Sequence, residues 1–272
     1  MYDLAIVGAG PAGAAAALSA LTARPGASVL LLDRATFPRD KACGDAIGPQ
    51  AVAMLRRLGA FAALDGYRPL AWFELGTGAR IAVRRRLPGA TYTVPRQVFD
   101  DRLVHAAVTA GAELRRWRAR HVDQRTGYVA IDDDIAARVV VGADGANSRI
   151  RSVLGWPSNP PAALAIAMRG YAPAGSVEGQ RIVLDDANWP AYGWTFAIGD
   201  GRANVGWGAI RSHFTGSRTT LASQVRAQAD GAAAVTDLSA HHLPLSTRRP
   251  SPALGGVLLA GDAASLINPL SG

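Results

Sequence analysis

The sequence predicts an α/β fold in which a parallel sheet with covering helices is interleaved with a second, mostly antiparallel β-sheet. Three short apolar runs, residues 2–7, 139–141 and 256–260, each lead into a glycine-containing turn, as buried strands of a parallel sheet do. Residues 163–210 instead alternate short apolar stretches with glycine, proline and tryptophan, which indicates antiparallel strands. Because the first pattern lies at both ends of the chain, we expect each sheet to be built from separate segments.

The first apolar run leads into a turn that is typical of phosphate binding. The turn consists of Gly8, Ala9, Gly10, Pro11, Ala12 and Gly13, and an alanine-rich helix follows it. Gly8 lets the strand turn sharply, Gly10 lacks the Cβ that would keep a pyrophosphate off the backbone, and Gly13 lets the helix pack closely on the strand. The free N–H groups and the dipole at the helix N-terminus would then hold the phosphates.

The next apolar run supplies the context that this turn requires. Residues 28–32 are predicted to form a buried parallel strand that ends in Asp33, about 20 residues after Gly13. A carboxylate at this place accepts hydrogen bonds from the hydroxyls of an adenosine ribose. We therefore expect a Rossmann-like, dinucleotide-binding domain, with Asp33 and its neighbour Arg34 at the ligand.

Two later strand ends carry acidic residues. Residues 139–141 are followed by Gly142, Ala143, Asp144 and Gly145, and residues 256–260 are followed by Gly261 and Asp262. Ligands of doubly wound sheets bind at the carboxyl ends of the strands, so these side chains are expected to face the same site as the first turn.

The remaining elements follow from periodicity and turn residues. We expect helices over residues 49–58, 97–110 and 217–229, and strands over residues 72–74, 80–83, 164–171 and 181–184. From residue 230 to Pro252 the chain is polar and indicates no element. In residues 190–197, strand period two puts Tyr192, Trp194 and Phe196 on one face, with a hairpin partner at 203–208. Such an aromatic face is usually plain core.

Two segments of the chain resemble motifs of the geranylgeranyl reductase family of flavoproteins, which shares its fold with p-hydroxybenzoate hydroxylase. Pro38–Asp45 matches that family's Pro-Arg-Asp-Lys-x-Cys-Gly-Asp segment. Residues 192–194 match its Tyr-Gly-Trp strand, which lines a cavity for a prenyl chain, although Ala197 stands where the family has proline. The resemblance covers essentially all 272 residues.

The resemblance implies an FAD site, and the family's motifs indicate which residues of this chain would form it. Cys43 and Gly44 would lie beside the isoalloxazine, with Cys43 in a positional role; an inert buried cysteine is the alternative. Arg96, before the helix at 97–110, would lie on the flavin side or is only a solvated charge. Asp144 would order local hydrogen bonds, Asp262 would bind the ribityl chain, and residues 268–272, with Pro269, would reach the pyrimidine edge. The substrate pocket would be lined by Tyr192, Trp194 and Phe196.

Composition excludes several other classes of function. The net charge is +8, but the basic residues are scattered arginines with the single lysine Lys41, so we expect no nucleic-acid binding, whereas attraction to anionic lipid surfaces fits the charge. No cluster of residues has metal-ligand spacing, so we expect no metal. The uncharged stretch 4–23 is interrupted by the glycine turn and is not expected to span a membrane. The single cysteine allows no internal disulfide, which fits a protein of the reducing cytoplasm. If it contacts lipid, we expect it at the inner face of the membrane.

These observations lead to one hypothesis and two alternatives. We expect an FAD-dependent reductase that saturates carbon–carbon double bonds of an isoprenoid, either a geranylgeranyl lipid or a prenyl-quinone side chain, with NADPH or a ferredoxin as the electron donor. A flavin-dependent monooxygenase or halogenase would share the fold, and a catalytically incomplete FAD-binding fragment is the other alternative, because the family continues beyond residue 272. A truncated chain is expected to bind FAD weakly. We expect residues 1–70, 95–160 and 250–272 to form the FAD-binding domain and residues 71–94 and 161–249 the substrate domain.

Overall fold

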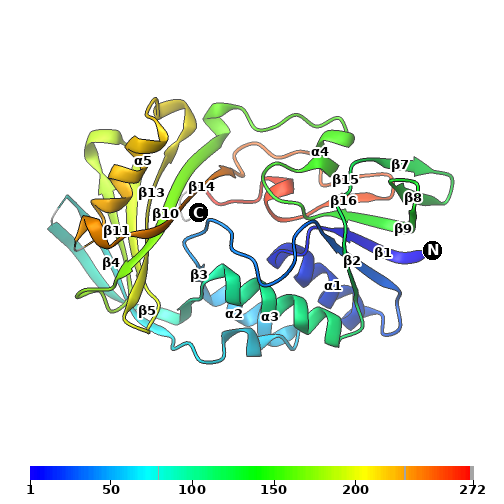
Figure 1. The fold of residues 1–272 in the computed structure, drawn as a ribbon, viewed down its shortest axis with the longest axis horizontal. Helices are drawn as coiled ribbons and strands as arrows, with labels where there is room; N and C mark the ends of the chain where they lie inside the picture. The colour runs from blue at the N-terminus through cyan, green and yellow to red at the C-terminus, as the bar shows by residue number, and fades with distance from the viewer. Residues whose placement is uncertain (79, 230, 270–272) are drawn as a thin grey trace.

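Two sheets stand side by side along the long axis of the computed structural model, which describes residues 1–78, 80–229 and 231–269 (Figure 1). One sheet has the strand order β15-β16-β9-β1-β2-β6, and β8 and β7 extend it from β9. Its members are β1 (Tyr2–Val7), β2 (Val29–Asp33), β6 (Glu113–Arg116), β7 (Val122–Arg125), β8 (Tyr128–Ile131), β9 (Ile135–Gly142), β15 (Ala253–Leu254) and β16 (Val257–Leu259).

The centre of this sheet is parallel, as the apolar runs predicted. β1 lies between β2 and β9, and β16 pairs with β9 in the same direction. Leu30, Leu31 and Leu32 of β2 are fully buried, which explains why this strand is apolar at every position instead of alternating. The predicted α/β, FAD-binding type of fold is thus confirmed.

The second sheet has the order β14-β10-β13-β12-β11-β4-β5-β3 and is antiparallel except where β11 pairs with β4. Its members are β3 (Ala46–Ile47), β4 (Leu70–Thr77), β5 (Arg80–Thr93), β10 (Leu164–Pro173), β11 (Gln180–Asp185), β12 (Ala191–Ala197), β13 (Arg202–Ile210) and β14 (Thr236–Pro244). Strand β14 lies where the sequence indicated no element. Its residues are mostly half-buried or exposed, so the strand carries no apolar pattern of its own and depends on its ladder with β10. The division into two domains remains a prediction, and β3, which the prediction placed in the FAD-binding segment 1–70, pairs with β5 in the second sheet.

Helices cover the outer faces of both sheets (Figure 1). α1 (Pro11–Ala23) and α3 (Arg96–Thr109) share one core cluster with β1 and β2, and α5 (Arg218–Arg226) packs on the second sheet. The other helical segments are α2 (Pro49–Arg57), α4 (Arg149–Val153) and the 3-10 helices η1 (Phe61–Leu64), η2 (Pro161–Ala163), η3 (Asp186–Asn188), η4 (Arg211–His213), η5 (Ala232–Ala234) and η6 (Gly261–Ala264). Within the described residues, no helix has both the length and the apolar character needed to cross a bilayer.

Candidate functional site

A cavity of about 1350 Å³ lies between the two sheets and opens over the carboxyl ends of the parallel strands. This volume exceeds the roughly 300–1,000 Å³ that is usual for one bound small molecule, so the cavity has room for a dinucleotide and a second ligand. Every residue that the sequence assigned to cofactor or substrate lines it, except Gly13. These lining residues are Gly8, Gly10, Pro11, Ala12, Asp33, Arg34, Cys43, Gly44, Arg96, Asp144, Gly145, Tyr192, Trp194, Phe196, Gly261, Asp262 and Pro269. Of the expected 268–272 segment, residues 270–272 lie outside the described residues.

The glycine turn has the geometry that a pyrophosphate needs. A Cβ at Gly8 would lie 2.3 Å from the carbonyl oxygen of Ala143, and one at Gly13 would lie 1.8 Å from that of Gly8, so both positions are packed backbone to backbone. At Gly10, by contrast, a Cβ would meet nothing nearer than the Arg39 guanidinium at 3.5 Å, because the backbone there faces the cavity. No side chain among the described residues caps α1, which leaves its first N–H groups for a phosphate. The turn therefore fits the diphosphate of FAD.

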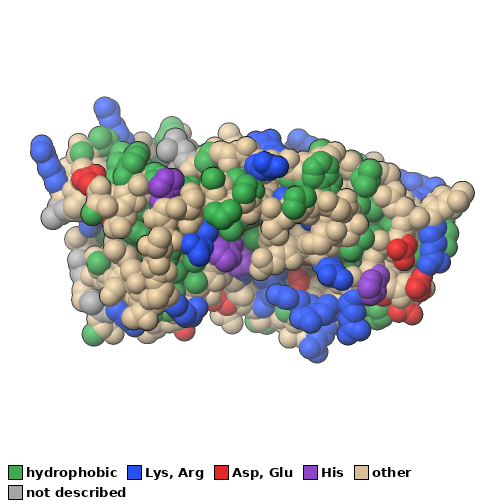
Figure 2. Space-filling view, turned by 90° about the horizontal axis from the view of Figure 1, so that it is seen from above, with side chains coloured by type: hydrophobic (Ala, Val, Ile, Leu, Met, Phe, Trp, Pro, Cys, Tyr) green, Lys and Arg blue, Asp and Glu red, His purple; other side chains and the backbone are tan. Residues whose placement is uncertain are grey.

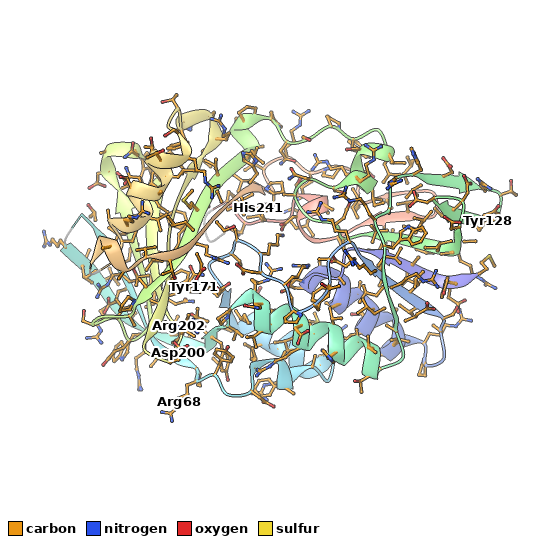
Figure 3. The ribbon with its side chains drawn as sticks, viewed as in Figure 1. Arg68, Tyr128, Tyr171, Asp200, Arg202 and His241 are labelled. Atoms are coloured by element: carbon orange, nitrogen blue, oxygen red, sulfur yellow. The ribbon has the colours of Figure 1, made fainter. Side chains whose placement is uncertain are left out.

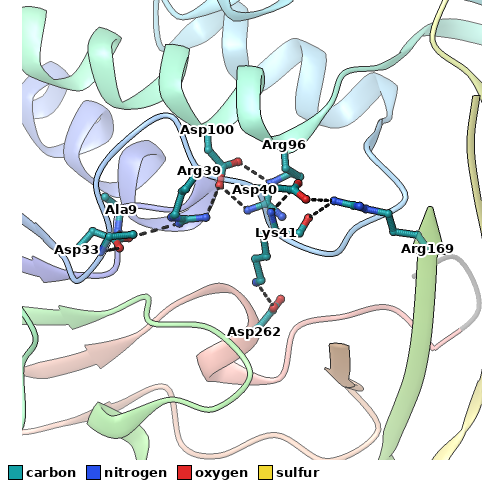
Figure 4. Close-up of polar contacts among 10 residues, drawn as sticks. Ala9, Asp33, Arg39, Asp40, Lys41, Arg96, Asp100, Arg169 and Asp262 are labelled. Atoms are coloured by element: carbon teal, nitrogen blue, oxygen red, sulfur yellow. Dashed lines mark hydrogen bonds and ion pairs between the residues drawn. The ribbon is translucent and has the colours of Figure 1, made fainter. Parts of the chain in front are cut away.

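Beside the turn, Asp33 starts a chain of ion pairs that ends at Arg96 (Figure 4). The Asp33 carboxylate accepts the Ala9 N–H at 3.0 Å and contacts Arg39 at 3.4 Å. Arg39 also binds Asp100 at 3.1 Å, and Asp100 accepts two hydrogen bonds from Arg96, at 2.5 and 2.7 Å. The sequence gave no role to Arg39 or Asp100, and the contact that joins them spans 61 positions of the chain.

Arg96 is buried, and the alternative of a solvated surface charge is therefore wrong. Burial by itself would lower the pKa of this guanidinium, but hydrogen bonding to Asp100 and the neighbouring Cys43 raises the pKa above its ordinary value. A permanent positive charge thus stands in the cavity wall beside Cys43.

Lys41 reaches across the cavity to Asp262 (Figure 4). Its Nζ lies 3.0 Å from the Asp262 carboxylate, which follows β16, and 3.6 Å from where a Cβ at Gly145 would be. Arg169 of β10, which is buried, pairs with the Asp40 carboxylate and donates to the Lys41 carbonyl oxygen at 3.5 Å. The only lysine of the chain therefore links the polar loop to the third strand-end motif.

Asp144, in the second strand-end motif, orders its own turn. It accepts hydrogen bonds from the Ser148 hydroxyl at 2.5 Å and from the N–H groups of Arg149 at 2.6 Å and Ile150 at 3.2 Å. The Asp144 carboxylate therefore satisfies the first N–H groups of α4, while the Ser148 side chain caps this helix by accepting the Arg151 N–H.

The two motifs that suggested a reductase meet in space. A Cβ at Gly44 would lie 3.3 Å from the Phe196 ring and 3.5 Å from Nε1 of Trp194. Asn204 joins the two segments, because it accepts the Trp194 indole N–H at 2.9 Å and donates to the Cys43 carbonyl oxygen at 2.8 Å. The rings of Tyr192, Trp194 and Phe196 follow one another along β12 at centroid distances of 6.1 and 6.3 Å. The Cys43–Gly44 loop thus lies on an aromatic wall of the cavity.

Small residues and a histidine form the adjoining part of this wall. The strand register places Tyr192, Gly208, Ala167 and His241 in one row across β12, β13, β10 and β14. His241, to which the sequence gave no role, lines the cavity between the two sheets (Figure 3), and its Nε2 is buried without a hydrogen-bond partner among the described residues. Burial and the nearby Lys41 lower the pKa of His241 to about 4, so the ring is neutral at pH 7. Period two along β14 would have identified it had that strand been predicted.

The rim of the cavity and the surface around it are basic. Arg34, Arg118, Arg120 and Arg149 lie in the cavity lining. Blue Lys and Arg side chains outnumber red acidic ones on the face seen from above (Figure 2), in agreement with the net charge of +8. A basic rim favours anionic ligands such as phosphates.

Comparison with known proteins agrees with this geometry. The FAD binding domain family matches residues 1–168. A menaquinone reductase of Mycolicibacterium smegmatis is 34% identical over 99% of the chain and 72% of its own length, and digeranylgeranylglycerophospholipid reductase 2 of Methanopyrus kandleri is 32% identical over 100% and 72%. The solved structure of a geranylgeranyl bacteriochlorophyll reductase-like protein from Thermoplasma acidophilum has a TM-score of 0.84 at 22% identity, covering 99% of this chain and 72% of that one, which shows the fold alone.

Proposed function

The chain belongs to the FAD-binding domain family and, within it, to the geranylgeranyl reductase family of FAD-dependent oxidoreductases, and from this premise we propose that it saturates a carbon–carbon double bond in an isoprenoid chain. The substrate would be a geranylgeranyl lipid or the side chain of a prenyl quinone. One observation carries the proposal: the Cys43–Gly44 loop and the aromatic wall of β12 meet in one cavity.

The residues around the first sheet would hold FAD. Gly10 and the N-terminus of α1 would bind the pyrophosphate, Asp33 the adenosine ribose, and Asp262 the ribityl chain. When bound, FAD supplies the hydride that adds to one carbon of the alkene. Because Lys41 contacts Asp262 at 3.0 Å, it would place a positive charge beside the ligand there.

The second sheet would bind and orient the isoprenoid. Tyr192, Trp194 and Phe196 offer an apolar face that excludes water, and the small side chains of Ala167 and Gly208 leave space in front of it. We assign Cys43 a positioning role at the end of this wall. The electron donor would be NADPH at a transient site or a ferredoxin.

Substrate access would take place at a membrane. An isoprenoid lipid or quinone dissolves in the bilayer, and the net charge of +8 favours an anionic surface, such as the inner face of the cytoplasmic membrane. Sedimentation with vesicles that contain anionic lipids, compared with neutral vesicles, tests this, and we expect binding to the anionic vesicles that is lost at high salt.

An anaerobic assay tests the reaction itself. The FAD-loaded protein is reduced with dithionite, incubated without oxygen with a menaquinone or a geranylgeranyl lipid, and the products are analysed by mass spectrometry. We expect a gain of two hydrogen atoms for each bond reduced. Trp194→Ala should lower this activity because it opens the aromatic wall, whereas Trp156→Ala, which changes an exposed tryptophan outside the cavity lining, should not.

Other outcomes would support the alternatives. Product that gains oxygen, with oxygen consumed only when substrate is present, would replace the reductase by a monooxygenase. Stable FAD binding without turnover of either substrate would support a non-catalytic FAD-binding module.

A further inference from the structure

Asp45 is a buried carboxyl group at the end of the Cys43–Gly44 loop, and neither the cofactor nor the substrate role described above uses it. Asp45 is 1% exposed, and its backbone has a positive φ of 61°, which is uncommon for a residue other than glycine. Oδ2 accepts the Tyr171 hydroxyl at 2.7 Å and the Asn204 amide at 2.8 Å. Oδ1 is buried and has no hydrogen-bond partner among the described residues.

Asn204 connects this carboxyl group to the aromatic wall. The same amide nitrogen that donates to Asp45 also donates to the Cys43 carbonyl oxygen at 2.8 Å, and its oxygen accepts the Trp194 indole N–H. Asn204 is fully buried, so this arrangement excludes water. The position of the Cys43–Gly44 loop therefore depends on a side chain that is shared with Asp45.

The charge state of Asp45 matters because half of its carboxyl group is unsatisfied. An ionised carboxylate has two oxygens that both require donors, and a buried oxygen without one is unfavourable. Burial raises the pKa of Asp45 to about 6, although Tyr171, Asn204, Arg169 and Arg96 act in the opposite direction. The titratable and charged groups that face Asp45 are Tyr171 and Arg169 of β10, Arg96 of α3, and Tyr67 of the segment before β4.

We propose that Asp45 is a positioning residue that acts as a proton-dependent latch: its neutral carboxyl group holds the Cys43–Gly44 loop against Trp194 and Phe196, and its ionised form loosens that loop. The proton goes to and from solvent, and no bond to substrate or cofactor is involved. When the loop detaches, Asp45 reaches water and ionises at its ordinary pKa, so an increase in pH favours the detached state. The functional meaning of the latch rests on the proposed function, because the loop forms part of the wall of the cavity in which that reaction would occur.

Cys43 reports the state of the latch directly, because it is the only cysteine in the chain. The rate of its modification by 4,4′-dithiodipyridine is measured on the FAD-loaded protein from about pH 5 to about pH 7.5, for wild type and for Asp45→Asn, which keeps the acceptor oxygen but cannot ionise. Dividing the wild-type rate by the Asp45→Asn rate at each pH removes most of the pH dependence of the thiol itself. We expect the ratio to be above one already at the acidic end and to rise about tenfold further by the neutral end, a shift of about 1.4 kcal/mol in the opening equilibrium.

Two controls support the interpretation. Asp237→Asn changes another aspartate with positive φ, which is exposed and outside the cavity lining, and should follow wild type at every pH. Hydrogen–deuterium exchange of residues 41–46 in wild type needs no variant, and the protection of these amides should be lower at pH 7.5 than at pH 5 after correction for intrinsic exchange.

A ratio that stays constant with pH, or amide protection that does not fall, would overturn the latch. Neither measurement needs turnover. An inactive protein with the expected ratio would therefore refute the proposed reaction and leave the latch standing, and an active protein with a constant ratio would do the reverse.

Discussion

Gly10 is the one position of the glycine turn where the backbone is open to the cavity, and Gly10→Ala tests its role without disturbing the fold. The added Cβ would meet only the guanidinium groups of Arg39 and Arg96, at 3.5 and 3.9 Å, which are ordinary contact distances. The backbone at Gly10, with φ −72° and ψ −176°, is one that alanine adopts freely. We therefore expect the free energy of unfolding of the FAD-free protein to fall by no more than about 1 kcal/mol.

The effect on FAD binding should be much larger. The methyl group projects into the space in front of the α1 N-terminus and would push the pyrophosphate away from the backbone N–H groups. One hydrogen bond to a charged group contributes about 1.5–3 kcal/mol, so its loss weakens binding by about 10- to 150-fold.

Gly13→Ala should behave differently although it makes the same chemical change. Its Cβ would lie 1.8 Å from the Gly8 carbonyl oxygen, and only a backbone shift can relieve that contact. We expect this variant to lose about 1–3 kcal/mol of stability as well as affinity for FAD, as overpacked sites do.

Two measurements on each protein decide the question. FAD affinity is obtained by titrating the FAD-free protein and following the quenching of tryptophan fluorescence, and stability is obtained from urea unfolding without FAD. A Gly10→Ala variant that binds FAD within about threefold of wild type would refute the assignment of Gly10 to the pyrophosphate.

Further substitutions test the contacts around the cavity. Trp194→Phe leaves the buried Asn204 oxygen without its donor, which should cost about 1–3 kcal/mol in urea unfolding; an unchanged midpoint would contradict this. Asp144→Ala removes the acceptor of the first N–H groups of α4 and of the Ser148 hydroxyl and should cost about 1–2 kcal/mol in the same assay, with a matching gain in amide exchange of α4. For Asp45, the pKa is about 6 in the folded protein and 3.8 as the ordinary value, so the folded state binds more protons between these values and stability falls as the pH rises through them. The free energy of unfolding of Asp45→Asn minus that of wild type should thus increase by about 3 kcal/mol from about pH 3.5 to about pH 7.5, and a constant difference would show that Asp45 titrates normally.

Local patterns predicted much of the parallel sheet and its turns. The spacing of Gly8, Gly10 and Gly13 and the position of Asp33 gave the strand, turn and helix at the N-terminus, because each of these features is set by backbone conformation within a few residues. The same reasoning placed Asp144 and Asp262 after strands β9 and β16. The aromatic side chains of β12 lie on the cavity side together, as period two requires.

Strand β14 was not predicted, because it has no local pattern of this kind. Its residues from 236 to 244 are mostly polar or partly exposed, and an edge strand of this kind is defined by the register with its neighbour rather than by its own sequence. His241 was missed with it, since its place in the cavity wall follows from its pairing with Ala167.

The glycine turn, the strand-end acids and the family were therefore determined by the sequence alone, because those signals are local in the chain. Only the tertiary structure decided which side chains meet across the cavity. Lys41 contacts Asp262 from 221 positions away, and Asn204 joins Cys43 from 161 positions away. Such contacts depend on how two sheets pack against each other, and no spacing within one segment encodes that arrangement.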